Sequence, residues 1–148
     1  MERKFNIWRG DAEKGEFKTY SIKLEQGMVV LDAIHRIQAE HSNDLAVRWN
    51  CKAGKCGSCS MEINGRPKLS CMTRMNEFAE DDIITIQPLK TFPIIKDLVT
   101  DVSWNYKQNK MIPPFKPQDK INGSDHIMYQ QDVERIQEFR KCIECYLC

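Results

Sequence analysis

The spacing of four cysteines limits what this chain can fold into more than any other feature. Cys51, Cys56 and Cys59 follow the pattern C-x4-C-x2-C, and Cys71 comes after eleven further residues. A loop with three thiolates and a distant fourth is a ligand arrangement of 2Fe-2S clusters. Each of the two irons in such a cluster needs two thiolates, so four are required. The spacing therefore predicts a 2Fe-2S site made of these four cysteines.

The residues between the cysteines fit such a site. A loop that wraps a cluster must turn tightly and point its amides at the sulfurs, and Gly54 and Gly57 tolerate the positive φ that this needs. The amides and the basic residues Arg48, Lys52 and Lys55 would favour a cluster that gains negative charge on reduction, which raises its potential. For the two lysines, a simple solvated surface is an equally good interpretation.

Other uses of the cysteines are less consistent with the sequence. Zinc also takes four thiolates, but its sites usually pair two short knuckles, whereas here the fourth cysteine stands alone. A disulfide framework is disfavoured because the count of seven is odd, the cysteines fall in two tight clusters and no signal segment precedes them.

The sequence predicts a compact α+β domain around this loop. Alternating β-rich segments flank turn residues at 10–11 and 14–15, an apolar face recurs at helical spacing, and Asn64-Gly65 is a strong hairpin signal. The expected elements are strands 3–9 and 16–24, a helix over 29–41, strands 60–63 and 67–72, and a last strand over 83–88. This order is typical of the β-grasp fold found in plant-type ferredoxins, with Val30, Leu31, Ile34 and Ile37 on the buried helix face.

The character of the sequence changes after residue 90. Ile95, Leu98 or Val99, Val102 and Tyr106 repeat at helical spacing, a proline-rich stretch over 112–117 interrupts the pattern, and a second helical pattern covers 129–141. We therefore expect a ferredoxin domain over 1–106, a linker over 107–127 and the incomplete start of an α-helical ferredoxin domain over 128–148.

A second cysteine cluster follows that helix directly. Cys142, Cys145 and Cys148 read C-x2-C-x2-C, the opening of a run that ligates 4Fe-4S clusters. Three of the four ligands are present, so we expect that the chain is a fragment of a longer one.

Charge and apolar composition exclude some classes of partner. The net charge of +1 provides no basic stripe for nucleic acid, and no run of residues has the length and apolarity of a signal peptide or a membrane span. The expectation is a protein on the cytoplasmic side without a membrane span of its own.

The order of these features closely resembles the iron–sulfur subunit of succinate dehydrogenase and fumarate reductase. The resemblance covers essentially the whole chain and rests on residues 50–71 (NCKAGKCGSCSMEINGRPKLSC), 72–75 (MTRM), 88–101 (PLKTFPIIKDLVTD) and 138–148 (EFRKCIECYLC). It implies that Cys51, Cys56, Cys59 and Cys71 hold a 2Fe-2S cluster and that Cys142, Cys145 and Cys148 supply three of the four ligands of a 4Fe-4S cluster. A 3Fe-4S cluster is implied only for a longer chain.

The resemblance also implies a function. Such a subunit passes single electrons between the FAD of a flavoprotein subunit and downstream clusters and quinone, and it is attached to the inner face of the cell membrane through a cytochrome b-type anchor subunit. It has no catalytic residue of its own, and we interpret His35, His41 and His126 as helix, helix-end and loop residues. The rival hypothesis is a stand-alone 2Fe-2S ferredoxin shuttle. The shared motifs do not separate succinate oxidation from fumarate reduction.

Overall fold

The computed structural model describes residues 2–114, 116 and 129–148, which form two compact units. The first unit comprises Met1–Val102 together with Ile143–Cys148, and the second comprises Ser103–Cys142. In the first unit the elements are β1 (Glu2–Gly10), β2 (Gly15–Lys23), α1 (Val30–Glu40), β3 (Ser60–Ile63), β4 (Arg66–Leu69), a 3-10 turn η1 (Met75–Glu77), β5 (Ile84–Gln87), β6 (Ile94–Lys96) and β7 (Val99–Thr100).

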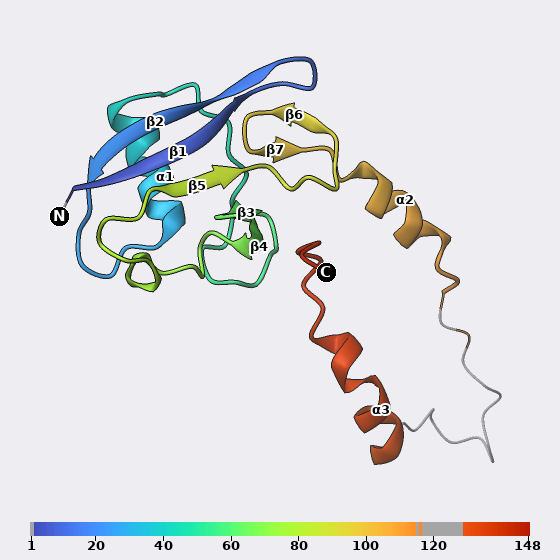
Figure 1. Cartoon of the computed structure of the whole chain (residues 1–148). Helices are drawn as coiled ribbons and strands as arrows, with labels where there is room; N and C mark the ends of the chain where they lie inside the picture. Colours follow the sequence, from blue (N-terminus) through green and yellow to red (C-terminus); the bar gives the residue numbers. More distant parts are fainter. Residues whose placement is uncertain (1, 115, 117–128) are drawn as a thin grey trace, which may run out of the picture. The chain divides into compact units, whose positions relative to one another are not determined.

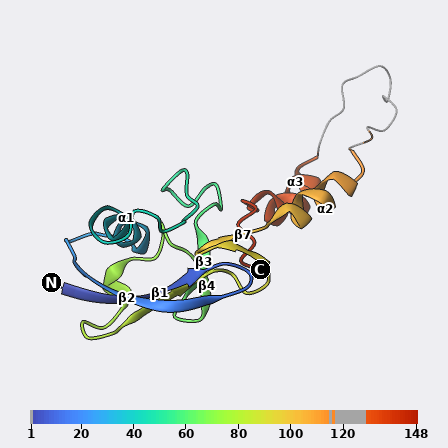
Figure 2. The same ribbon diagram turned by 90° about the horizontal axis from the view of Figure 1, so that it is seen from above.

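A five-stranded mixed sheet with one helix on its face forms the body of the first unit (Figures 1 and 2). The strand order is β2-β1-β5-β3-β4, with β1 antiparallel to β2 and parallel to β5. The predicted last strand, β5, is therefore the central strand of this sheet. Between β3 and β4, Asn64 and Gly65 have φ of 48° and 73°, which confirms the predicted tight hairpin.

The core lies between α1 and the sheet. Phe5 and Ile7 of β1 and Ile84 and Ile86 of β5 are completely buried, because alternate residues of a strand point to the same face. They meet Val30, Ile34 and Ile37 of the predicted apolar face of α1, all completely buried, together with Ala33. The fourth predicted residue, Leu31, is also completely buried but packs in a separate cluster. Burying an aliphatic or aromatic side chain of this size stabilises a fold by roughly 1.5–3 kcal/mol, so this layer supplies much of the driving force for folding. The α+β fold of the ferredoxin type is confirmed.

The predicted helical pattern from Ile95 to Tyr106 is wrong in its first half. Residues 94–100 form the short antiparallel hairpin of β6 and β7, and helix α2 (Ser103–Met111) begins only after it. The apolar residues meet different surroundings: Leu98 joins the core with 3% exposure, whereas Ile95 is 53% exposed. The apolar residues of this segment are three or four positions apart, which is the spacing of a helix face. Two short strands joined by a tight turn can produce the same spacing.

Asp97 provides the physical reason for that turn. It has a φ of 49°, and its buried carboxylate accepts hydrogen bonds from Arg9 Nε at 3.0 Å, the Gly10 N–H at 3.0 Å and the Ala46 N–H at 2.8 Å. Burial opposes the positive charge of Arg9, but hydrogen bonds to Tyr20 and Asp97 and the attraction of the Asp97 carboxylate raise its pKa above the ordinary value. Asp97 thus joins the first hairpin, the segment after α1 and the β6–β7 hairpin.

The second unit contains α2 and α3 (Gln130–Arg140), and neither helix has a buried side chain. Among the described residues, no helix is long and apolar enough to cross a membrane. α2 extends into the start of the predicted linker, 107–127. Residues 115 and 117–127 of that linker, which include His126, lie outside the described residues. The division into domains over 1–106, 107–127 and 128–148 stays a prediction.

Replacing Asp97 tests the junction. We expect Asp97→Ala to lower the free energy of unfolding by about 3 kcal/mol, because it leaves two N–H groups without their acceptor and removes one of the two carboxylates that pair with Arg9. Asp97→Asn should cost less, since asparagine tolerates positive φ and keeps one acceptor oxygen. Urea unfolding monitored by circular dichroism measures both values. Equal losses in the two variants would contradict this role.

Candidate iron–sulfur site

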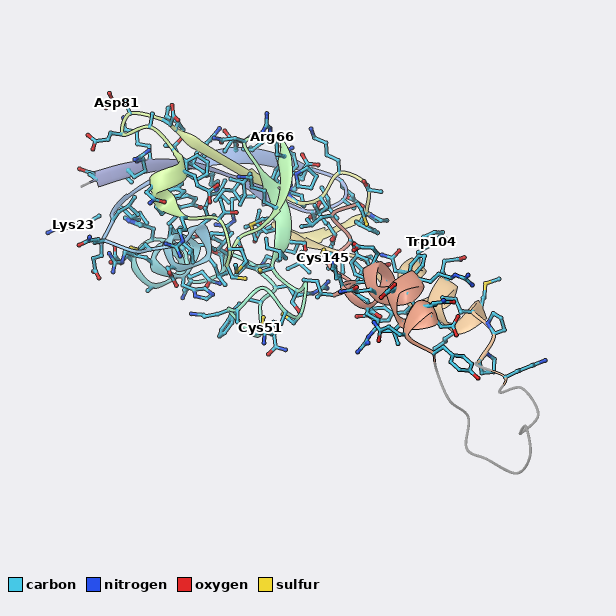
Figure 3. All side chains as sticks on the ribbon, turned by 90° about the horizontal axis from the view of Figure 1, so that it is seen from below. Lys23, Cys51, Arg66, Asp81, Trp104 and Cys145 are labelled. Atoms are coloured by element: carbon cyan, nitrogen blue, oxygen red, sulfur yellow. The ribbon has the colours of Figure 1, made fainter. Side chains whose placement is uncertain are left out.

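The predicted cysteine loop, in which Figure 3 labels Cys51, lies between α1 and β3. The fourth cysteine lies in the turn after β4. The expected strand over 67–72 ends at Leu69, so Cys71 stands in a turn instead of on a strand. The turn frees the Cys71 backbone from the sheet, which lets its side chain approach the loop.

The loop has the backbone conformation that the sequence predicted. Gly54 and Gly57 have φ of 65° and 68°. Lys52 also has a positive φ, 54°, which its residue type does not indicate. These turns direct backbone amides at sulfur atoms: the N–H groups of Ala53 and Lys55 each lie 3.3 Å from Cys51 Sγ, and the Cys51 N–H lies 3.5 Å from Cys56 Sγ. Amides placed in this way stabilise negative charge on the sulfurs.

The four thiols come together as two pairs. The Cys51 N–H donates to Cys56 Sγ, and the side chains of Cys59 and Cys71 are hydrogen-bonded to each other. Cys71 also accepts a hydrogen bond from the Gly54 N–H and interacts electrostatically with Cys51, so the two pairs adjoin. In the described part of the chain, no three His, Cys, Asp or Glu side chains gather closely enough to hold a single metal ion. Pairwise grouping fits a dinuclear centre, in which each iron takes two thiolates.

The two pairs have different environments. Cys59 and Cys71 are buried, with 3% and 5% exposure, whereas Cys51 and Cys56 are partly exposed. Hydrogen bonds from the Ser58 hydroxyl and from the Cys51 and Ser58 backbone lower the pKa of Cys56 to about 6. Burial, followed by the hydrogen bond to Cys59, raises the pKa of Cys71 to about 11. A metal must therefore displace a more tightly held proton at Cys71 than at Cys56.

Helix α1 holds the inner pair in place. The first N–H groups of a helix have no partner within the helix. Here the Val30 N–H donates to the Thr73 carbonyl at 2.9 Å, and the Leu31 N–H donates to the Ser70 carbonyl at 3.1 Å. The Leu31 side chain packs against Cys59 and Cys71. The turn that carries Cys71 is thus fixed to the end of α1.

Ser70 ties the two inner cysteines to each other. It is completely buried, and both its N–H and its hydroxyl donate to the Cys59 carbonyl at 3.1 Å. Sequence reasoning missed this residue and Ser58. Their positions next to a cysteine are the one signal that could have indicated them, since small hydroxyl residues are common in any loop.

Trp49 precedes the first cysteine of the loop and lies between a histidine of α1 and a lysine of the loop. Trp49 is 47% exposed. The centroid of its ring lies 4.8 Å from that of the His35 ring and 4.9 Å from Lys52 Nζ. His35 lies in α1 and His41 forms its C-terminal cap, so they are the helix residue and the helix-end residue that the sequence predicted.

Of the second cysteine cluster, Cys142 and Cys148 are exposed and Cys145 is partly buried. Cys145 and Cys148 belong to the first unit, and Cys142 belongs to the second.

Comparison with known proteins identifies the family. A family model described as the 2Fe-2S iron–sulfur cluster binding domain matches residues 4–107. The chain belongs to this family. Its membership favours iron over zinc for the pairs of thiols described above.

Individual relatives extend the similarity beyond that domain. The succinate dehydrogenase iron–sulfur subunit of Paracoccus denitrificans is 33% identical over 150 residues, which are 99% of this chain and 56% of the relative. The fumarate reductase iron–sulfur subunit of Mycobacterium tuberculosis (strain CDC 1551 / Oshkosh) is 30% identical over 135 residues, 89% of this chain and 54% of the relative.

A solved structure agrees with these two relatives. A chain of the Mycobacterium smegmatis Sdh1 complex in the apo form is 58% identical, with a TM-score of 0.94 over 99% of this chain and 62% of that chain. The resemblance predicted from the motifs is confirmed. The chain spans just over half the length of the curated relatives that it matches.

Truncating Leu31 tests how α1 supports the site. We expect Leu31→Ala and Ile37→Ala each to lower the free energy of unfolding by about 2–5 kcal/mol, because both side chains are completely buried in α1. Leu31→Ala alone should also reduce the iron retained during anaerobic dialysis against a chelator, since it removes the support beneath Cys59 and Cys71. Equal iron loss from the two variants would show that general destabilisation is responsible.

Proposed function

We propose that this chain is the electron-transfer part of an iron–sulfur subunit of succinate dehydrogenase or fumarate reductase. The observation that carries the proposal is the pairing of Cys51 with Cys56 and of Cys59 with Cys71 around a loop that directs amides at the sulfurs. In this proposal these four cysteines hold a 2Fe-2S cluster. When bound, such a cluster changes by one electron at a time, which suits it to connect two-electron flavin chemistry with a one-electron relay.

The chain's own residues adjust and protect the site. The amides of Ala53 and Lys55 stabilise added negative charge on Cys51, and the Lys52 and Lys55 side chains of the same loop add positive charge, which favours the reduced state. Leu31 and the α1–turn contacts keep water from the inner thiols. No side chain needs to act as an acid, a base or a nucleophile, so we assign no catalytic residue.

The second cysteine cluster extends the proposal. Cys142, Cys145 and Cys148 would supply three of the four ligands of a 4Fe-4S cluster, and a 3Fe-4S cluster would need cysteines from a longer chain. The similarity of 99% of this chain to a succinate dehydrogenase subunit supports a role in such a relay over that of a stand-alone ferredoxin.

The proposed partners follow from this role. A flavoprotein subunit with FAD would exchange electrons with the first site, and a cytochrome b-type anchor would hold the complex at the inner face of the cell membrane on the cytoplasmic side. The name of the solved Mycobacterium smegmatis complex, of which one chain resembles this one over 99% of its length, supports assembly with other subunits. No interaction with nucleic acid is proposed.

Cysteine substitutions test the ligand assignment. In protein purified anaerobically, we expect a red-brown colour and about two irons and two sulfides per chain from the first site. Cys56→Ser and Cys71→Ser should each abolish or strongly change the EPR signal of the reduced 2Fe-2S centre, because each removes a thiolate. Cys148→Ser serves as the matched control and should leave that signal intact. A colourless protein that contains zinc would overturn the proposal.

The potential of the first site gives a separate test. We expect a midpoint potential well above the value of about −400 mV of plant-type ferredoxins, since the relay must accept electrons from a flavin that succinate has reduced. Lys52→Ala and Lys55→Ala should each lower it by removing a nearby positive charge. Lys23→Ala is the control, because Lys23 and Cys51 lie far apart in Figure 3. Redox titration followed by EPR measures the values, and a wild-type potential near −400 mV would contradict the expectation.

A further inference from the structure

The last six residues, 143–148, lie against the first cysteine loop within the first unit. The hydroxyl of Ser60, which directly follows Cys59 in the sequence, lies 2.6 Å from the carbonyl oxygen of Cys145 and donates a hydrogen bond to it. The same hydroxyl lies 2.8 Å from the Gly57 carbonyl. A hydroxyl has one proton, so it can donate fully to one of the two at a time, and Cys145 is the closer acceptor.

A side chain at position 57 would collide with residues 143–148. A Cβ atom at Gly57 would lie 2.6 Å from Cys145 Cα, 2.8 Å from Cys145 N and 2.9 Å from the Glu144 carbonyl oxygen. All three are backbone atoms, which cannot move aside as the end of a flexible side chain can. The close approach of the two backbones therefore depends on glycine at this position, in addition to its φ of 68°.

Two further observations indicate that these contacts hold the segment in shape. The ring of Tyr146 meets that of Phe92 edge-on, with centroids 5.9 Å apart. Glu144 and Tyr146 have φ of 55° and 60°, a conformation that residues other than glycine rarely adopt. Such conformations persist where the surrounding structure fixes them.

We propose that Gly57, Ser60 and Phe92 form a seat that positions Cys145 beside the first cysteine loop. This inference rests on the proposed function, because Cys145 matters as a ligand of a second cluster. The seat connects the two sites by a short route: Cys59, the adjoining Ser60, one hydrogen bond and the backbone of Cys145. Ser60 and Gly57 are positioning residues in this route, and they fix the separation between one proposed ligand set and the next.

Ser60→Ala tests the hydrogen bond. In the cluster-loaded full-length protein, we expect the amides of residues 143–148 to exchange with deuterium roughly 2- to 10-fold faster, because one hydrogen bond that holds the segment is lost. Ser21→Ala is the matched control, since the Ser21 hydroxyl bonds to exposed Glu2 at the far strand pair and should leave this exchange unchanged. Unchanged exchange in Ser60→Ala would overturn the role of Ser60.

Two glycine variants separate the seat from backbone strain. Gly54 and Gly57 have nearly equal positive φ, 65° and 68°, so alanine strains the loop similarly at both. The three atoms nearest to a Cβ at Gly54 all belong to the flexible Met72 side chain, whereas at Gly57 the three nearest belong to the backbone of the segment. We expect Gly57→Ala to speed the exchange of residues 143–148 more than Gly54→Ala does.

The outcomes distinguish this inference from the proposed function. Absence of a 2Fe-2S signal in the wild type would reject the proposed function, while the exchange measurements would still report on the seat. A normal 2Fe-2S signal with equal effects of Gly54→Ala and Gly57→Ala on residues 143–148 would reject the seat alone. If Gly57→Ala fails to fold, Phe92→Leu, which removes the ring contact with Tyr146, takes its place with the same expected rise in exchange.

Discussion

The site depends on the hydrogen bonds between the first turn of α1 and the turn that carries Cys71. A helix begins with N–H groups that its own backbone cannot satisfy. In this fold the carbonyls of Ser70 and Thr73 accept two of them, and Leu31 fills the space behind Cys59 and Cys71. The same contacts that complete the helix therefore bring the distant fourth cysteine to a loop that already holds the other three.

The rest of the first unit keeps that arrangement rigid. The apolar layer between α1 and the sheet fixes the helix, and Asp97 joins the first hairpin to the segment that leads from α1 toward the cysteine loop. Both support a site whose cysteines come from a loop and a turn, elements that have little stability of their own. Cys59 and Cys71 are buried in the protein, whereas Cys51 and Cys56 lie nearer to solvent. One side of the site is therefore packed against the fold and the other is accessible.

The contact of residues 143–148 with the cysteine loop gives the order of the two cysteine clusters a structural meaning. Ser60 and Gly57 each adjoin a proposed ligand of the first site, and both meet the backbone of Cys145. Two cofactors exchange electrons efficiently only if they are held at a short, constant separation. A fold can provide this by seating one ligand segment directly on the loop of the other.

The amino-acid sequence by itself determined the positive-φ glycines, the tight Asn64-Gly65 turn and the buried face of α1, and it supplied the spacing on which the proposed ligand set rests. Each is local chemistry: thiolate spacing, backbone freedom and helical periodicity act over a few residues. Tertiary structure alone decided that residues 94–100 form strands, that Cys71 leaves β4 in a turn, and that Asp97, Ser70 and Ser60 bind backbone groups far away in the chain. The reason is that a buried polar group takes whichever partner packing brings near, and packing joins residues that the sequence keeps apart.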